Sequence, residues 1–161
     1  MEIDITKIKY RRTNIEDLNI LVDYRIRFLN ESGIRSEDEE TKELKKALRK
    51  YYRIAIPPNE FICWLVEYRD KILGVSGMVV YQVPGRYGFV SGKLGFICNM
   101  YTVPKARRRG ISTRLLSELV KEAKSLGLEY LHLRAHKDAI NIYRRAGFTE
   151  PFTLELQLKL K

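Results

Sequence analysis

The stretch Val103-Pro104-Lys105-Ala106-Arg107-Arg108-Arg109-Gly110-Ile111-Ser112 decides how this 161-residue chain folds and what it can bind. Residues 94–103 before the turn are apolar and β-rich, and a strongly periodic helical pattern begins at Ile111. The order is therefore strand, basic turn with a glycine, helix. A helix N-terminus presents unpaired backbone N–H groups and the positive end of the helix dipole, and the arginines add charge. This combination suits a phosphate or a pyrophosphate.

The turn matches neither of two common phosphate-binding motifs. The Walker loop needs a glycine, four residues and then Gly-Lys followed by Ser or Thr, and this stretch has no such run. The dinucleotide fingerprint needs three spaced glycines, and only Gly110 is present. From the residues alone, a basic loop that caps a surface helix remains an equal alternative.

The spacing resembles the Gcn5-related N-acetyltransferases, the GNAT family. That family carries Arg or Gln, two residues, Gly, one residue and then Gly or Ala, directly after a strand that ends in Val-x-Pro. Arg107 fits the first position, Gly110 the glycine and Ser112 the last small residue, where serine is a mild departure. A second block, Ala139-Ile140-Asn141-Ile142-Tyr143-Arg144-Arg145-Ala146-Gly147-Phe148, resembles the family's Ala-Ile-x-x-Tyr-x-x-x-Gly-Phe. The resemblance covers the chain from about residue 6 to the C-terminus.

The resemblance implies a fold and an activity. The fold class is α/β (α+β), the acyl-CoA N-acyltransferase fold, with a mixed, mostly antiparallel sheet that has a splayed parallel pair and is flanked by helices. Residues 1–161 are expected to form one N-acetyltransferase domain. The implied activity moves an acetyl group from the thioester of acetyl-CoA, as co-substrate, to a primary amine by direct attack in a ternary complex.

The resemblance also implies how acetyl-CoA is held. The turn from Arg107 to Thr113 would wrap the pyrophosphate with backbone N–H groups, and positions 100–103 would pair with the pantetheine arm as an added strand would. Arg145 is a further candidate for a cofactor phosphate. The predicted cofactor-binding residues are Met100, Tyr101, Thr102, Val103, Arg107, Arg108, Arg109, Gly110, Ile111, Ser112, Thr113 and Arg145.

Two residues are predicted to be catalytic. Tyr143 matches the family tyrosine near the thioester sulfur, a hydrogen-bond donor or general acid, and the alternative is a core aromatic. The strand from 94 to 103 has no acid, so the general base is open between His136, Glu67, Glu155 and a water chain. Histidine suits the task by its pKa, although a histidine at a strand end is often a structural hydrogen-bonding residue. His136 also stands where many family members have an asparagine.

The acceptor amine is expected to meet the first two helices. By resemblance, Tyr24, Arg25, Phe28 and Glu31 are candidate substrate-binding residues, and the alternative for each is an ordinary position on the helix surface. The acceptor is a small molecule or a peptide amine, and neither its identity nor the oligomeric state is encoded in a motif. A homodimer is possible in a family of this type.

Composition bounds the remaining alternatives. The net charge of +10 suits an anionic cofactor at Arg107–Arg109, and a nucleic-acid-associated protein is an alternative that rests on charge alone. A non-catalytic acetyl-CoA-binding regulatory module is another. No apolar run is long enough to cross a bilayer, and the N-terminus lacks a signal peptide's pattern, so a cytoplasmic protein without membrane contact is expected. Cys63 and Cys98 lie in apolar runs and predict buried, reduced thiols and no metal site.

Periodicity predicts the order of the elements. Helices are expected after a capping box at Thr13–Glu16, after a second box at Ser36–Glu39, from Ile111 to Leu126, and briefly from Asp138 to Gly147. Strands are expected at residues 6–12, 61–68, 72–83, 94–103, 129–135 and 152–160, the last from the alternation of Leu154, Leu156, Leu158 and Leu160.

Overall fold

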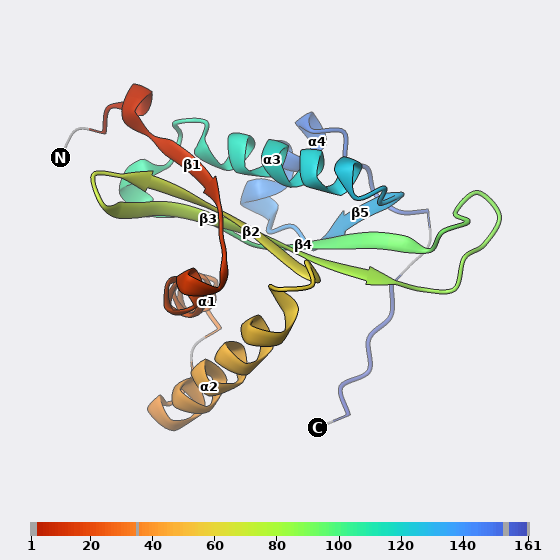
Figure 1. Ribbon diagram of the computed structural model, residues 1–161, viewed down its shortest axis with the longest axis horizontal. Helices are drawn as coiled ribbons and strands as arrows, with labels where there is room; N and C mark the ends of the chain where they lie inside the picture. The colour runs from red at the N-terminus through yellow and green to blue at the C-terminus, as the bar shows by residue number, and fades with distance from the viewer. Residues whose placement is uncertain (1–2, 35, 153–154, 161) are drawn as a thin grey trace.

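A twisted five-stranded sheet forms the centre of the computed structural model, which describes residues 3–34, 36–152 and 155–160 (Figure 1). The strands lie side by side in chain order: β1 (Lys9–Arg12), β2 (Phe61–Tyr68), β3 (Lys71–Gln82), β4 (Lys93–Thr102) and β5 (Tyr130–Leu133). Neighbours from β1 to β4 are antiparallel, and β4 and β5 are parallel. The mixed, mostly antiparallel sheet expected from the resemblance is confirmed.

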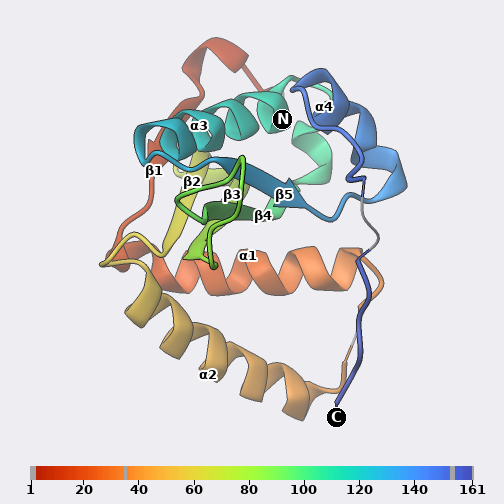
Figure 2. The same cartoon turned by 90° about the vertical axis from the view of Figure 1, so that its right-hand side faces the viewer.

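Helices cover both faces of the sheet (Figures 1 and 2). α1 (Leu18–Glu31) and α2 (Asp38–Ala55) lie on one face, and α3 (Ile111–Ser125) and α4 (Ile140–Arg145) lie on the other. α3 packs on the sheet because its apolar residues recur at helical spacing, and it buries Ile111, Leu115, Leu116, Leu119 and Ala123. Among the described residues, no helix is long and apolar enough to cross a membrane.

The helical segment that leads into α1 begins at Ile15, one residue later than the sequence predicts, and its first turn is a 3₁₀ turn. Thr13 does not cap it. The side chain of Asn14 accepts from the N–H of Glu16, and the carboxylate of Asp17 accepts from the N–H of Asn14. A 3₁₀ turn at Ile15–Asp17 then leads into α1. Asp17 also accepts two hydrogen bonds from Arg11 of β1, at 2.6 and 2.7 Å, so the cap ties the helix to the sheet.

The second expected cap is also wrong. α2 begins at Asp38 after Glu37, whose side chain makes no capping hydrogen bond. Three acidic residues in the first turn, Asp38, Glu39 and Glu40, interact favourably with the positive end of the helix dipole instead.

The parallel pair separates along β4. Pairing between β4 and β5 runs from Leu94–Tyr130 to Ile97–Leu133, whereas β4 continues to Thr102. Where the pairing stops, Asn99 has a φ of +54°, and the register of β4 against β3 shifts nearby. The second half of β4 therefore has a sheet partner on one side only, which is the splay that the family resemblance implies.

The last expected strand is wrong in the described part of its range. Leu154 lies outside the described residues, and no strand forms over 155–160, where Leu156, Leu158 and Leu160 are 83–90 % exposed. An alternating pattern becomes a strand only when a neighbouring strand supplies hydrogen bonds and covers the apolar side. Two other strands are shorter than expected, because a 3₁₀ turn at Ile5–Lys7 precedes β1 and β5 ends at Leu133.

Candidate functional site

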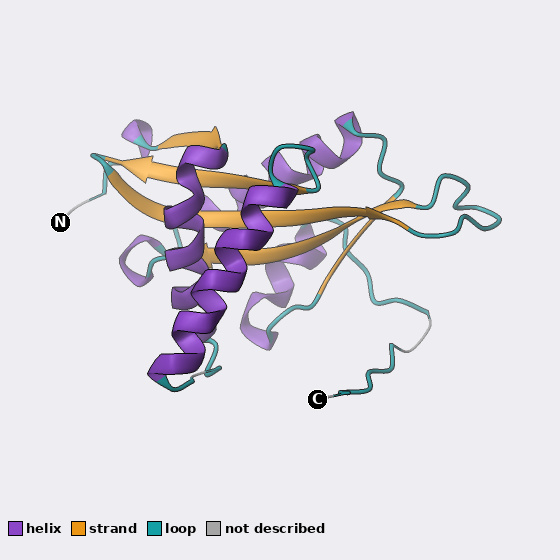
Figure 3. Cartoon of the chain, turned by 60° about the horizontal axis from the view of Figure 1, so that its bottom comes forward, coloured by secondary structure: helices purple, strands orange, loops and turns teal. Residues whose placement is uncertain are grey.

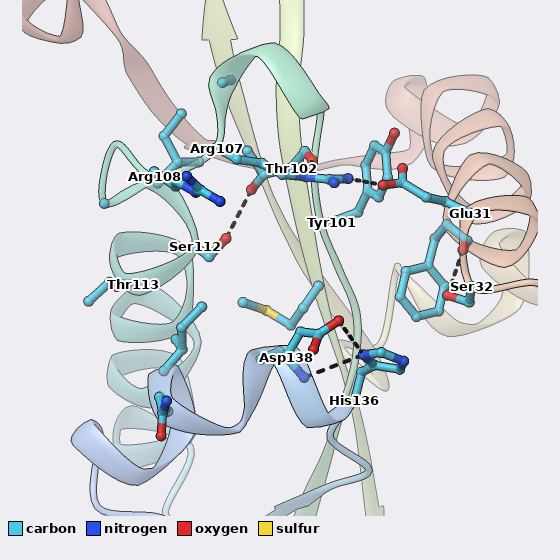
Figure 4. Close-up of a pocket in the computed structure, with 18 of the residues that line it drawn as sticks. Glu31, Ser32, Tyr101, Thr102, Arg107, Arg108, Ser112, Thr113, His136 and Asp138 are labelled. Atoms are coloured by element: carbon cyan, nitrogen blue, oxygen red, sulfur yellow. Dashed lines mark hydrogen bonds and ion pairs between the residues drawn. The ribbon is translucent and has the colours of Figure 1, made fainter.

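A groove with a volume of about 800 Å³ lies where β4 and β5 diverge (Figure 4). Its walls come from the end of α1, the second half of β4, the turn that leads into α3, and the segment from His136 to α4. Figure 3 shows the helices of the chain lying across the strands of the sheet. The lining residues are Phe28, Glu31, Ser32, Met100, Tyr101, Thr102, Ala106, Arg107, Arg108, Gly110, Ile111, Ser112, Thr113, His136, Asp138, Ala139, Asn141, Ile142 and Arg145.

The turn before α3 has the backbone shape of an anion site. Arg108 and Gly110 both have left-handed backbone angles, with φ of +59° and +76°, and Gly110 is the N-cap of α3. Left-handed residues next to a helix start aim successive N–H groups into one concavity. A Cβ atom at Gly110 would meet no atom within 4 Å, so this point of the turn faces open space. The concavity and the helix dipole both favour a negatively charged ligand.

The hydroxyls of Thr102 and Ser112 lie 3.0 Å apart and join the end of β4 to the first turn of α3. Serine at the last small position of the first motif is therefore accommodated, and its hydroxyl has a partner. This contact fixes the helix N-terminus against the splayed half of β4.

Arg107 spans the groove between the turn and α1 (Figure 4). Its Nε donates to the backbone carbonyl oxygen of Thr102 at 3.0 Å, and its guanidinium pairs with the carboxylate of Glu31 at the end of α1. This guanidinium lowers the pKa of Glu31. Because Glu31 is held ionised in an ion pair, it is a poor proton acceptor at neutral pH.

His136 lines the groove, and it also caps a 3₁₀ turn at Lys137–Ala139. Its Nδ1 lies 3.3 Å from the carboxylate of Asp138 and accepts from the N–H of that residue at 3.4 Å. Of the three side chains proposed as the base, only His136 lines the groove. Glu67 accepts from Arg11 at 2.7 Å, and Glu155 pairs with Arg134.

Tyr143 belongs to α4, and its side chain lies in the apolar core. The residue is 8 % exposed, and its ring centroid lies 6.0 Å from that of Phe148, at the end of the second motif. Burial raises the pKa of its phenol. Tyr143 is absent from the groove lining, whereas Ala139, Asn141 and Ile142 of the same motif belong to it. The ring thus packs as the core alternative requires, and the catalytic role stays a prediction.

The four residues proposed for acceptor binding divide into two pairs. Phe28 and Glu31 line the groove. Tyr24 is buried, its hydroxyl donates to the carbonyl oxygen of Ile72 at 2.6 Å, and it lines a separate, smaller cavity. Arg25 donates to the side-chain oxygen of Asn99 at 2.6 Å. Tyr24 and Arg25 therefore hold α1 against the sheet.

Two of the predicted cofactor residues, Val103 and Arg109, lie outside the groove lining, and the other ten belong to it. Sequence reasoning missed Ser32, Ala106, Asp138, Ala139, Asn141 and Ile142. Ala139, Asn141 and Ile142 lie inside the second motif, and Ala106 directly precedes the first, so the motifs could have indicated these four. Ser32 and Asp138 belong to neither motif.

The fold and the groove define an α/β domain with a splayed parallel pair and a basic helix N-terminus beside it. Residues 21–148 match the model of the acetyltransferase (GNAT) family. The chain therefore belongs to the GNAT family.

Solved structures agree with this assignment. The chain is 31 % identical to a predicted acetyltransferase from Clostridium acetobutylicum, solved with acetyl-CoA, with a TM-score of 0.85 over 95 % of this chain and 96 % of that one. A GCN5-related N-acetyltransferase from Ralstonia eutropha shares the fold, with a TM-score of 0.81 at 21 % identity over 94 % of this chain and 98 % of that one.

A curated relative matches over a shorter stretch. The chloroplastic GCN5-related N-acetyltransferase 6 of Arabidopsis thaliana is 33 % identical over 61 residues, which are 36 % of this chain and 21 % of that protein. The matching region thus spans about a fifth of the plant protein.

Proposed function

We propose that this chain is an acetyl-CoA-dependent N-acetyltransferase that transfers the acetyl group to a primary amine by direct attack in a ternary complex. One observation carries the proposal: a single groove joins a left-handed, basic helix N-terminus to the splayed half of β4. Family membership and the similar Clostridium acetobutylicum structure with acetyl-CoA support it.

The residues present fit acetyl-CoA at two places. At the turn, the N–H groups around Gly110 and the side chains of Arg108 and Arg145 would hold the phosphates. Along β4, residues 98–102 have no pairing with β5, so backbone groups on that side are available to the pantetheine amides. Bound in this way, acetyl-CoA supplies an activated acetyl group as a thioester.

The reaction needs a neutral amine and a proton for the departing thiolate. The amine nitrogen attacks the thioester carbonyl carbon, the C–S bond breaks, and the sulfur leaves as a thiolate that takes up a proton. Tyr143 is the proposed proton donor. Its raised pKa keeps the phenol protonated at neutral pH, as a donor requires. His136, at the edge of the groove, is the proposed acceptor for the amine proton.

The acceptor is proposed to enter beside α1. Phe28 offers an apolar surface, and the Ser32 side chain lies on the same wall next to Glu31. Small-molecule and peptide amines both remain candidate acceptors. One observation favours a second function, an acetyl-CoA-binding regulatory module: in the described residues, β4 offers the groove no carboxylate that could act as a base.

Release of free thiol from acetyl-CoA, measured against a panel of small amines and peptides, tests the proposal. We expect thiol release above the hydrolytic background for one class of amine, and mass spectrometry should find one acetyl group added to that amine. The same assay with Tyr143→Phe tests the proton donor. Binding of acetyl-CoA without acetylation of any amine in a panel spanning both classes would favour the regulatory module.

A further inference from the structure

A second cavity, with a volume of about 510 Å³, lies between α1, the start of β3 and the 3₁₀ turn that follows β4. Of the residues that line it, only Tyr101 also lines the groove. Figure 4 shows Tyr101 next to the ion pair of Arg107 and Glu31, on the α1 side of the groove. The two cavities are therefore neighbours that share one wall, and no step of the proposed transfer reaction uses the second.

Three cationic side chains from three different elements line this cavity. They are Arg27 from α1, Lys71 from β3 and Lys105 from the 3₁₀ turn after β4, and all three residues are exposed. Within the described ranges no acidic residue lines the cavity, and none of the three cations forms an ion pair. Asp23, on the same helix as Arg27, lies 4.0 Å from Lys45 instead. An anionic ligand would therefore neutralise three like charges that have no acidic partner in this part of the structure.

Local structure holds two of these cations at the cavity. Arg69 and Asp70 both have left-handed backbone angles, with φ of +47° and +58°, and they form the two-residue turn after which β3 begins at Lys71. The guanidinium carbon of Arg27 lies 4.8 Å from the centroid of the Tyr24 ring, and this stacking orients the side chain. The positive charges are thus set by a tight turn and by an aromatic ring.

The rest of the lining is aromatic or apolar. The hydroxyl of Tyr24 donates to the carbonyl oxygen of Ile72 at 2.6 Å, which fixes α1 over the start of β3. The rings of Tyr24 and Tyr101 meet edge to face, with centroids 6.0 Å apart. Val103 and Pro104 complete this wall. A ligand with an apolar or aromatic body can cover the wall, whereas an inorganic anion contacts only the cations.

We propose that this second cavity binds a small organic phosphate, a phosphate monoester with an apolar or aromatic body, without displacing acetyl-CoA. The phosphate group lies among Arg27, Lys71 and Lys105, and the body lies against the wall that includes Tyr101. A phosphate monoester suits three cations better than a carboxylate does, because it carries a charge of about −1.5 to −2 at pH 7 and three strong acceptor oxygens. The planar guanidinium of Arg27 also matches the geometry of phosphate oxygens.

Calorimetric titration with phenyl phosphate tests the proposal while saturating CoA occupies the groove. We expect binding of one phenyl phosphate per chain. Benzoate keeps the ring but has a single charge, and inorganic phosphate keeps the charge but has no ring. Each should bind roughly tenfold more weakly than phenyl phosphate, because each loses one of the two kinds of contact.

A pair of double variants locates the binding site. Lys71→Gln with Lys105→Gln removes two of the three cations and should weaken phenyl phosphate binding at least roughly tenfold. Lys46→Gln with Lys50→Gln removes the same amount of charge from exposed positions of α2 that line neither cavity, and it is the matched control. The control should bind phenyl phosphate as the wild type does. Circular dichroism should show both variants folded, since all four lysines are exposed.

The dependence of acetyl-CoA binding on phenyl phosphate separates the two cavities. A ligand at a neighbouring site changes the apparent Kd of acetyl-CoA by at most a limited factor, and the change levels off when that site is full. A ligand that competes for the groove raises the apparent Kd in proportion to its concentration. We expect the first behaviour, and the second would overturn the proposal.

Two further results would overturn it. Phenyl phosphate that binds the Lys71 and Lys105 double variant as tightly as the wild type is held elsewhere. Equal affinities for phenyl phosphate and inorganic phosphate would remove the aromatic wall from the site. Because phenyl phosphate binding is measured without any transfer reaction, failure of this proposal is distinguishable from failure of the proposed acetyltransferase activity.

Discussion

The two halves of β4 have different neighbours and different uses. From Leu94 to Ile97 the strand has β3 on one side and β5 on the other, so the sheet uses its backbone groups on both sides. From Cys98 to Thr102 only β3 remains, and Met100, Tyr101 and Thr102 line the groove. One half is a structural strand, and the other offers its backbone to a ligand.

The difference arises from what β5 does after Leu133. β5 ends there, and the chain turns at His136 into a 3₁₀ turn and α4, while β4 continues past a left-handed Asn99. Asn99 is held from α1 by Arg25 and contacts the hydroxyl of Tyr52 from α2 at 3.2 Å. α1 and α2 thus hold the point at which β4 leaves β5. Changes in the paired half should alter stability, and changes around the splayed half should alter binding and turnover.

The largest effect is expected at the turn beside the splayed half. Gly110→Glu adds a carboxylate where the phosphates are proposed to lie, and like charges at that distance cost several kcal/mol. We expect acetyl-CoA affinity to fall roughly a thousandfold in calorimetric titration.

Gly127→Glu is the matched control for that variant. Gly127 has a φ of +67° at the other end of α3, and a Cβ there also meets no atom within 4 Å. Both variants carry the same backbone strain, but only Gly110→Glu should lose affinity. Equal affinities in the two variants would remove the phosphate site from the turn.

A smaller effect, on stability and not on binding, is expected in the half of β4 that pairs with β5. Ile97 is 3 % exposed and packs in the core under α3. Ile97→Ala should lower the free energy of unfolding in urea by about 3 kcal/mol, because it leaves a cavity. Acetyl-CoA affinity measured below the unfolding transition should stay unchanged. Met100→Ala, three residues further along, should lower the free energy of acetyl-CoA binding by more than it lowers the free energy of unfolding. The reverse result would contradict the assignment of different roles to the two halves of β4.

Tyr143 tests whether a core residue can also act in the groove. Tyr143→Phe keeps the ring that packs against Phe148 and removes the hydroxyl. If the phenol is the proton donor, kcat should fall about a hundredfold with little change in acetyl-CoA affinity. An unchanged kcat would leave Tyr143 with packing alone. The neighbouring Ile142→Val, which keeps an apolar side chain of similar size at the groove wall, is the control for repacking.

The smallest effect is expected at the ion pair between Arg107 and Glu31. Both side chains are partly exposed, so Glu31→Gln should cost less than about 1 kcal/mol at neutral pH. Because the folded protein lowers the pKa of Glu31, the stabilisation is complete above the ordinary glutamate pKa of 4.5 and is lost as the pH falls through the lower pKa of the folded protein. Urea denaturation of both proteins at pH 7 and pH 3 should show a larger difference at pH 7 than at pH 3. A difference that was equally large at both pH values would mean that the pair is not electrostatic.

Most of the fold could be predicted from local sequence patterns. The apolar spacing of α3 and the two motifs around it predicted the strand, turn and helix that line the groove, because these features depend on residues close together in the chain. The C-terminal leucines show the limit of such patterns. Their alternation predicts a strand, yet a strand also needs a partner, and no local pattern names one.

The contacts that shape the groove could not be predicted from the sequence. Arg107 meets Glu31 and Arg25 meets Asn99 across more than seventy residues, and nothing near either residue indicates its partner. Tyr24 and Arg25 were predicted to face a substrate for the same reason. Their positions on α1 could be predicted from the sequence. The atoms that accept their hydrogen bonds, the carbonyl oxygen of Ile72 in β3 and the side-chain oxygen of Asn99, could not.

Calorimetric titration of the purified chain with acetyl-CoA is the decisive experiment for the proposed role of the groove. We expect saturable binding with one site per chain, competition by free CoA, and loss of binding in Gly110→Glu but not in Gly127→Glu. Absence of binding to the wild-type chain would contradict the proposed role of the groove. Binding that Gly110→Glu leaves intact would place acetyl-CoA elsewhere on the molecule.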